Sequence, residues 1–464
     1  MRLHTLLGMA LSIAYFNNAY ADNISMTNNK LSDAWNYYQE KTNDALMHIT
    51  NSPYFSKKQD KAEGYRHIFS EITQSTQAVI FSNDNYPTFQ FRPNQKIKIG
   101  LDNPDNAYFT SQISPENNYL IEGDLGSTAT FAIQSLAGVP GYDGAGTSKE
   151  QDSLDNQTIT TDRDGRFKIF IGEEKPDNLD EIADNFLKTG YVTIDSLKKP
   201  VQTLLVRYSY NDWNREQKGN IHITKLDKNN NPVTGMAPNL TVDDIADNIK
   251  VAGDQTYETT VFWDEFAQKL DNMFASNYNK FTAPSATDGG LKSQFSATAV
   301  IDLPKSDKEV LMVTTYPSDA EYQGFQLGNM WYESLDYKTH QTSLTSKQSY
   351  LTHDKEVCSI PAGAYGPGIP AETIVKDSCY RYVVSAEDPE VKNWLDTTGH
   401  HKVFAFLRWQ GGSTHASDYI APWSKVVKMK EVKSLFKMDE RVHGSDREKQ
   451  LRDRYTAVQQ RYQE

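Results

Sequence analysis

The sequence predicts a mainly β protein built from antiparallel β-sandwich or jelly-roll domains, with accessory helices at the N-terminus, in the middle and at the C-terminus. Three observations predict this class. From Phe89 onward, apolar residues alternate with polar ones at a period of two, as in half-buried strands. Gly, Asn, Asp and Pro separate these runs at the spacing of sandwich strands. Aromatic residues, which favour strands, make up 11% of the chain.

The length of 464 residues exceeds one ordinary hydrophobic core and predicts more than one domain. Apolar residues at helical spacing mark both ends of the chain, and the segment Thr241 to Phe281 repeats that spacing inside the β region. A segment with Pro284 and two glycines follows and suggests a boundary near residue 285. The predicted organisation is a helical segment over 22–88, a first sandwich over 89–285 with a helical insertion, a second sandwich over 286–440 and a C-terminal helix over 441–464.

Residues 1–21 have the pattern of a secretory signal peptide. Arg2 stands near the start, Leu6 to Phe16 is a short apolar core, and Ala19-Tyr20-Ala21 supplies small residues for cleavage. An apolar run this short does not span a hydrocarbon layer of about 30 Å, and no later stretch of the sequence is long and apolar enough. We therefore expect an exported protein, periplasmic or secreted, without stable membrane insertion.

Cys358 and Cys379 are the two cysteines of the chain and flank a Gly- and Pro-rich stretch. Because export places them in an oxidising compartment, we expect a disulfide between them. A bridge that closes a loop of about twenty residues contributes on the order of 3 kcal/mol. The alternative is a pair of free thiols, and zinc bound by cysteine is excluded if the disulfide forms.

The formal net charge of −13 argues against a nucleic-acid partner, because phosphate binding requires a basic surface. Several familiar enzyme motifs are also missing from the sequence. It contains no GxSxG elbow, no Walker A loop, no HExxH helix and no GxGxxG after a strand. The chemistry must therefore be sought in less familiar groups of polar residues.

Asp102, Asp105 and Asn106 form the first such group, in a predicted turn after an apolar run. Their oxygens suit a hard divalent cation such as calcium, or the hydroxyls of a polyol. The alternative is that Asp and Asn beside Pro104 are turn-forming residues that bond to their own backbone. Both interpretations stay open, so the sequence leaves the metal and the cofactor undetermined.

The second group lies between the predicted strands Tyr380 to Ser385 and Lys402 to Trp409. Its polar and aromatic members are Asn393, Asp396, His400, Arg408 and Trp409. Asp396 in contact with His400 would fix the imidazole tautomer and leave the other nitrogen as a base or ligand. Arg408 lies an even number of residues from His400, so the two share a face in an extended chain. The alternative is that Asp396 caps the turn, while His400 and Arg408 satisfy buried polar groups.

With these residues the chain resembles a bacterial exported family of paired domains of unknown function with a C-terminal NWLDTxGH...RW signature. The similar stretches are GNMWYESLDY over 328–337, QTSL over 341–344, Asp388-Pro389, NWLDT over 393–397, Gly399-His400 and Arg408-Trp409, with earlier likeness at 100–106, Tyr108, Tyr119, Gly123, Arg207, Asp212-Trp213 and Glu216. The resemblance implies β-sandwich domains without an established activity and adds Glu333 to the binding candidates. The stretch from Cys358 to Cys379 departs from the family pattern.

Three functions follow as hypotheses. We expect binding of a small polar ligand or saccharide in a β-sandwich pocket, with Asp102, Asp105, Asn106, Asn393, Trp409 and Glu333 as binding residues. The second hypothesis is a hydrolase in which His400, oriented by Asp396, is the general base and Arg408 stabilises negative charge. The third is a structural or secreted interaction protein whose motifs only maintain the fold. The sequence does not decide whether the protein is an enzyme, nor its oligomeric state.

Overall fold

The computed structural model describes residues 29–463 except 145, 287–289, 292, 366–368, 370 and 371, and four sheets containing twenty strands enclose its main hydrophobic cores. Nearly all strand pairs are antiparallel, so the prediction of a mainly β, antiparallel fold with several helices is confirmed. The predicted signal peptide over 1–21 lies outside the described residues. The predicted linker over 282–290 also falls partly outside them, and β11 (Ser285–Ala286) occupies part of its remainder.

The first unit consists of two sheets that enclose one hydrophobic core. One sheet has the order β1-β2-β9-β4-β5, with β8 on β9, and the other has the order β10-β3-β6-β7. The strands are β1 Gln90–Phe91, β2 Asn106–Gln112, β3 Asn118–Asp124, β4 Thr130–Ala137, β5 Lys149–Asp155, β6 Arg166–Gly172, β7 Asn185–Lys188, β8 Tyr191–Ile194, β9 Leu197–Ser209 and β10 Ile221–Leu226.

The second unit encloses its own core between two further sheets. Their orders are β11-β12-β19-β14-β15 and β16-β17-β13-β20, with β18 on β17. Besides β11, the strands are β12 Gln294–Asp302, β13 Glu309–Thr315, β14 Tyr322–Gly328, β15 Ser343–Thr345, β16 Leu351–Thr352, β17 Cys379–Ser385, β18 Trp394–Asp396, β19 Lys402–Gln410 and β20 Trp423–Lys428. Cys358 and Cys379 form the predicted disulfide at the start of β17.

The second unit repeats the strand order of the first. Within the sheets, the spatial order β2-β9-β4-β5 corresponds to β12-β19-β14-β15, and β10-β3-β6 corresponds to β20-β13-β17. Even the unusual parallel pair is repeated, as β6 with β7 and as β17 with β18. The repeat places two arginines at equivalent positions of the central strands, because Arg207 is paired with Ala132 of β4 and Arg408 with Gly324 of β14.

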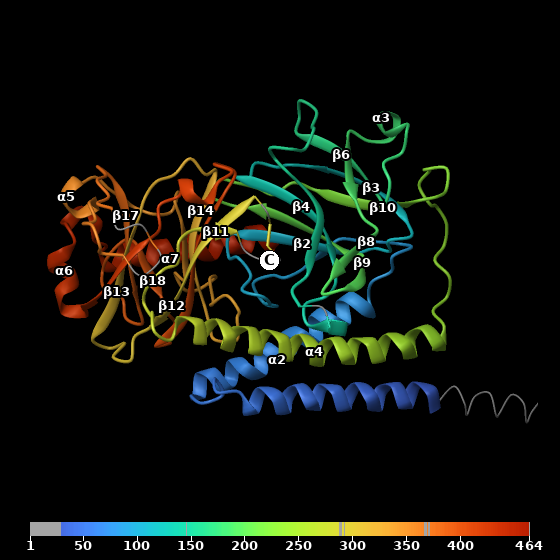
Figure 1. The fold of residues 1–464 in the computed structure, drawn as a ribbon, viewed down its shortest axis with the longest axis horizontal. Coiled ribbons are helices and arrows are strands. Elements are labelled where there is room, and N and C mark those ends of the chain that lie inside the picture. Colours follow the sequence, from blue (N-terminus) through green and yellow to red (C-terminus); the bar gives the residue numbers. More distant parts are fainter. Residues whose placement is uncertain are drawn as a thin grey trace, which may run out of the picture.

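Helices join the two units (Figure 1). The first helix, over residues 29–51, and α2 (Lys58–Val79) lie beside α4 (Val242–Phe274), which runs beneath both units. Thr241 caps α4 by accepting a hydrogen bond from the Asp244 amide. The C-terminal helix α7 (Gly444–Tyr462) returns to the junction, where Val458 packs into the core of the first unit. The shorter helices are α3 Leu179–Ile182, α5 Lys355–Cys358 and α6 Val432–Leu435, with 3-10 turns at Tyr142–Gly144, Ala416–Asp418, Met429–Glu431 and Met438–Glu440.

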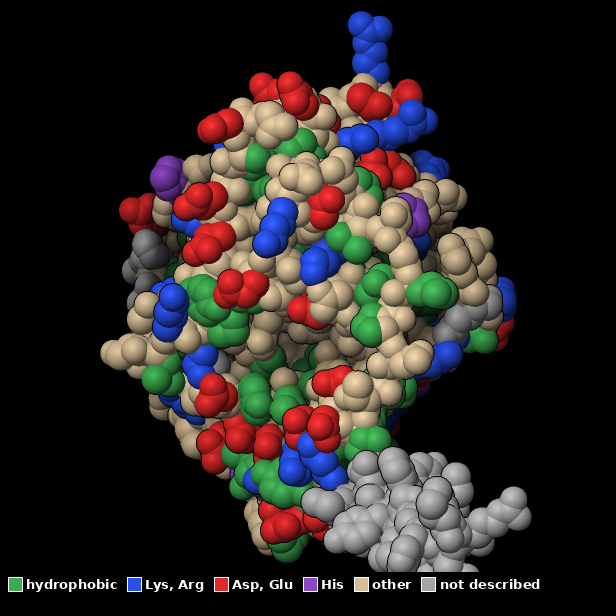
Figure 2. Space-filling view, turned by 90° about the vertical axis from the view of Figure 1, so that its right-hand side faces the viewer, with side chains coloured by type: hydrophobic (Ala, Val, Ile, Leu, Met, Phe, Trp, Pro, Cys, Tyr) green, Lys and Arg blue, Asp and Glu red, His purple; other side chains and the backbone are tan. Residues whose placement is uncertain are grey.

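The surface of the first unit carries charges of both signs. On the end of the molecule drawn in Figure 2, Lys and Arg side chains are interspersed with Asp and Glu, and the residues coloured on this face form no continuous basic field. Among the described helices, none is long and apolar enough to cross a membrane.

Candidate functional site

The turn that connects β14 to β15 is the centre of the candidate site, and we call residues 328–334 the signature turn. Its shape depends on Asn329, whose side-chain oxygen accepts hydrogen bonds from the amides of Trp331 and Glu333. Trp331 then packs against α2 and donates to the Asp60 carbonyl. Gly64 permits this approach, since a Cβ there would lie 2.8 Å from the Trp331 ring. The signature turn is thereby fixed to α2.

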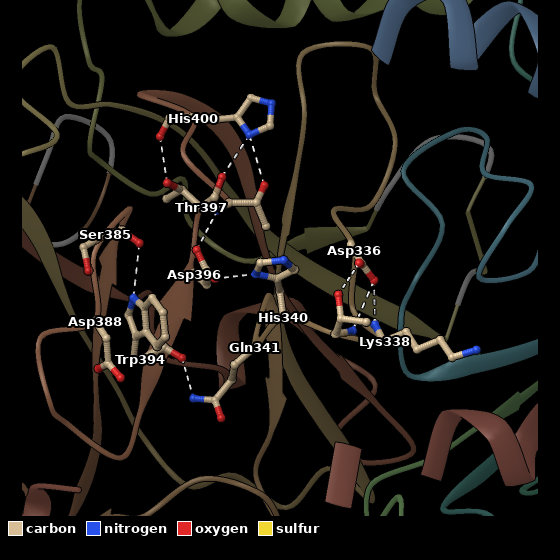
Figure 3. A network of polar contacts seen from close by, with 12 residues as sticks. Asp336, Lys338, His340, Gln341, Ser385, Asp388, Trp394, Asp396, Thr397 and His400 are labelled. Carbon is tan, nitrogen blue, oxygen red and sulfur yellow. Dashed lines mark hydrogen bonds and ion pairs between the residues drawn. The ribbon is translucent and has the colours of Figure 1, made fainter. Parts of the chain in front are cut away.

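His400 points at two carboxylates of α2. Its Nδ1 lies 2.9 Å from the Thr397 carbonyl oxygen, which can only accept, and 3.3 Å from Nε2 of Gln59, which can only donate. The shorter contact favours a proton on Nδ1. Nε2 faces Glu63 Oε2 at 3.0 Å and Asp60 Oδ1 at 3.8 Å. Figure 3 shows the ring bonded to the Thr397 backbone and directed away from Asp396. The nitrogen that faces the carboxylates is therefore the one that binds either a second proton or a metal ion.

The electrostatics of this group reflect its burial. Burial alone would lower the pKa of His400, but the hydrogen bond and the charge of Glu63 outweigh it and raise the pKa. Burial would raise the pKa of Glu63, yet the hydrogen bond to His400 brings it below its usual value. The pKa of Asp60 is raised by burial. Glu63 is further held by the side-chain amide of Asn329, at 3.0 Å.

A second, fully buried acid–base group lies further along α2. His67 Nδ1 is 2.9 Å from Glu333 Oε1, while His67 Nε2 and both carboxylate oxygens of Glu71 have no hydrogen-bond partner among the described residues. Burial raises the pKa of Glu71 to about 7. We call Asp60, Glu63 and His400 the outer group, and His67, Glu71 and Glu333 the inner group. Because residues 60, 63, 67 and 71 follow helical spacing, both groups lie on one face of α2.

The predicted residue Asp102 also contacts the signature turn. Its carboxylate accepts hydrogen bonds from the Ser334 amide and hydroxyl, and Lys98 donates to the carbonyls of Ser334 and Leu335. Burial raises the pKa of Asp102 to about 6. Asp102 and Glu333 thus lie in one region, where Asp102 anchors the turn and Glu333 orients His67.

The predicted pairing of Asp396 with His400 is wrong. The Asp396 carboxylate instead bonds Nδ1 of His340 at 2.7 Å, because the turn after β18 directs Asp396 and His400 to opposite sides (Figure 3). Asn393 bonds both the amide and the carbonyl of Tyr350 and so joins two loops. Both residues support the turn that presents His400.

The remaining predicted residues lie elsewhere. Arg408 donates to the Leu101 carbonyl and to Gln326 between the facing sheets of the two units, whereas Trp409 stacks on Tyr419 in the second core. Asp105 accepts from Trp213 and Tyr322, and the side-chain oxygen of buried Asn106 has no partner among the described residues. Among the described residues, no hydrogen bond or ion pair joins the 102–106 turn to His400. Both polar groups instead contact the signature turn, Asp102 through Ser334 and His400 through Glu63 and Asn329.

Asp60, Glu63 and His67 were not singled out in the sequence, because α2 is predicted there as a packing helix. The apolar residues that mark it as a helix do not define its buried face, since Tyr65 and Phe69 are 47% and 65% exposed. The buried face carries Gly64, His67 and Glu71. Polar residues recur at positions 60, 63, 67, 71 and 74 at helical spacing, and this pattern could have indicated a polar face of the helix.

Asp60, Glu63 and His400 together have residue types that could hold a metal ion. One ligand atom from each of Asp60, Glu63 and His400 lies within 4.8 Å of the other two. Nε2 and Oε2 are 3.0 Å apart, a separation typical of a hydrogen-bonded ion pair and also short enough for both atoms to bind one ion. The Thr397 carbonyl supplies the outer hydrogen bond that commonly orients a metal-binding histidine.

Comparisons with known proteins establish the fold alone. No protein-family model and no curated protein matches the chain. The structure is similar to the crystal structure of an uncharacterized protein from Burkholderia cenocepacia, with a TM-score of 0.68 and 20% sequence identity over 87% of this chain and 99% of that chain. The VPA0106 protein from Vibrio parahaemolyticus gives a TM-score of 0.39 and 12% identity over 84% of this chain and 100% of that one, which is too low to support an argument.

Proposed function

We propose that the protein binds a divalent transition-metal ion through Asp60, Glu63 and His400, and that this ion binds a small polar ligand such as a saccharide. The observation that carries the proposal is the orientation of His400. Its Nδ1 is bonded to a carbonyl, and its Nε2 faces two carboxylates from a helix more than 300 residues away in sequence. Imidazole together with carboxylates suits zinc, manganese or iron better than calcium, which takes oxygen ligands.

The exposure of the group favours ligand exchange on one side. The His400 side chain is 4% exposed, whereas Asp60 and Glu63 are 18% and 22% exposed. Three protein ligands leave positions around the ion for water or for the hydroxyls of a ligand. Export and a sandwich or jelly-roll scaffold, as expected from the sequence, belong to the same proposal.

The hydrolase hypothesis loses its original acid–base pair. Asp396 is bonded to His340, and Nε2 of His400 already faces Glu63 and Asp60. A general base must reach its proton within hydrogen-bond range or through one water. Polar-ligand binding therefore remains the function that these contacts support best.

The test is titration calorimetry of the chelator-treated protein with Mn²⁺ and Zn²⁺. We expect one ion per chain for the wild type, at least tenfold weaker binding for His400→Ala and Glu63→Gln, and unchanged binding for His401→Ala. His401 is a matched control because it is the neighbouring imidazole but is not part of the three-residue group. Absence of saturable binding, or equal binding by His400→Ala, would show that the group is only an ion pair.

The polar-ligand part needs its own measurement. The metal-loaded protein is titrated with a glycan panel, with and without chelator. We expect at least one saccharide to bind, and chelation to weaken that binding at least tenfold. If the folded, metal-loaded protein binds no saccharide of the panel, the proposal of saccharide binding is refuted, while the proposal of a cation site is unaffected.

A further inference from the structure

A separate cavity of about 520 Å³ lies between the C-terminal half of α4 and the outer face of the β12–β19 sheet. Its walls are mostly apolar and aromatic, and its main contributors are Phe266, Leu270, Phe274, Phe281, Tyr332 and Phe406. A cavity of this size and lining is in the range of small-molecule sites. None of the predicted binding residues lines it.

The aromatic wall is held in place by ring contacts. Tyr332, from the signature turn, stacks on Trp263 at 5.5 Å and meets Phe266 edge-on at 5.1 Å. It also meets Phe404 of β19 edge-on. Tyr332 has a φ of +58°, a left-handed conformation that is uncommon for a side chain of this size. The turn therefore presents this ring to the cavity in a fixed orientation.

The wall contributes one polar group, the Tyr332 hydroxyl. Tyr332 is 6% exposed as a residue, and its hydroxyl is not among the fully buried polar atoms that lack a partner, so it is accessible to solvent. Burial raises the pKa of Tyr332 to about 12, so the hydroxyl remains a donor at neutral pH. An acceptor on a bound molecule can bond to it.

Two lysines contribute positive charge to the lining of the same cavity. Lys269 and Lys280 belong to its lining, and Lys280 bonds only to the Ser424 carbonyl among the described residues. Arg408 lies behind the wall, with its guanidinium 4.9 Å from the centre of the Phe406 ring. The apolar wall, the hydroxyl donor and the two lysines together favour an apolar molecule that carries an anionic acceptor.

We propose that this cavity binds an amphipathic carboxylate, such as a medium-chain fatty acid or an arylalkanoic acid. The apolar body of the ligand packs against Phe266, Leu270 and Phe406. A carboxylate accepts from the Tyr332 hydroxyl and is favoured by the charges of Lys269 and Lys280. This site is distinct from the proposed cation site, since it shares none of Asp60, Glu63 and His400.

The probes are decanoate and its uncharged analogue 1-decanol, measured by calorimetry on the full chain. We expect decanoate to bind the wild type at one per chain and decanol to bind at least tenfold more weakly. Tyr332→Phe lowers decanoate affinity several-fold, and Lys269→Gln with Lys280→Gln brings it toward that of decanol. Because the cation site is separate, His400→Ala binds decanoate like the wild type.

Two tryptophan variants make the location testable. Ser285 is an exposed residue of the lining, so Ser285→Trp fills the cavity and is expected to abolish decanoate binding. Ser276→Trp, at an exposed position outside the lining, is the matched control and retains binding. Absence of decanoate binding to the wild type, or equal binding by Ser285→Trp, would overturn the proposal. Equal affinities for decanoate and decanol would refute its charged part.

Discussion

The two units share a strand order but differ in the connection that follows β4 in the first and β14 in the second. In the first unit this connection reaches α4, where the Asp143 amide donates to Glu258, and β9, where Lys199 bonds Asp143. In the second it is the signature turn, which contacts α4 through Tyr332 and α2 through Trp331. The same place in the repeat therefore docks on helices in both units, but only the second brings imidazole and carboxylate groups together there.

In a repeated fold, a loop that differs between the two units is a candidate functional site. The strands and cores satisfy the same packing requirements twice, whereas the loops that meet helices are free to differ. We infer that the site lies where the second unit departs from the first. We expect the two units to differ also in the contacts that stabilise their sheets.

Each unit carries an ion pair on the outer face of one sheet, and the two pairs differ strongly in burial. In the second unit Arg381 bonds Glu440 with both side chains almost fully buried, while in the first unit Lys168 and Glu122 are about half exposed. Because Glu440→Gln leaves a buried guanidinium unpaired, we expect a loss of about 3–5 kcal/mol in unfolding free energy. Glu122→Gln costs less than about 1 kcal/mol. Urea unfolding measures both, and equal losses would contradict the comparison.

The disulfide cross-links the second unit and not the first, since Cys358 and Cys379 are the two cysteines of the chain. Replacing both by alanine is expected to lower the unfolding free energy by about 3 kcal/mol, because the closed loop restricts the unfolded chain. Reductant should have the same effect on the wild type and none on the variant. A wild type whose stability is insensitive to reduction would refute this prediction.

Equivalent strand positions hold Gly324 in the second unit and Ala132 in the first. A Cβ at Gly324 would lie 2.5 Å from Asp105 Oδ2, which bonds Tyr322. We expect Gly324→Ala to cost about 1–3 kcal/mol through crowding, and Ala132→Gly about 0.5–1 kcal/mol through backbone entropy. Thermal unfolding gives the order, and a larger effect at Ala132 would contradict it.

Much of the fold follows from local patterns in the sequence. The alternation in Ala297 to Leu303 predicts a strand, and β12 ends at Asp302. The disulfide followed from two cysteines and an expected compartment. The repeat of strand order was not predicted, because equivalent strands share hydrogen-bond partners and topology rather than residues. Strand β5 is likewise recognisable only in the structure, because its pairing with β4 is made by backbone bonds.

The site was predicted in part. His400 and Glu333 stand out in the sequence, but their partners lie on α2, 337 and 266 residues away. Local spacing carries no information about such contacts. The pairing of His400 with Asp396 failed because the turn reverses direction between them, so closeness in sequence did not become closeness of side chains.

The central claim is that His400 is a metal ligand held by the second unit against α2. Electron spin echo envelope modulation of the Mn²⁺-loaded protein tests it most directly, because it detects nitrogen bound to the ion. The account predicts coupling to one imidazole nitrogen that is lost in His400→Ala and kept in His401→Ala. Bound Mn²⁺ without nitrogen coupling, or a coupling unchanged in His400→Ala, would contradict it.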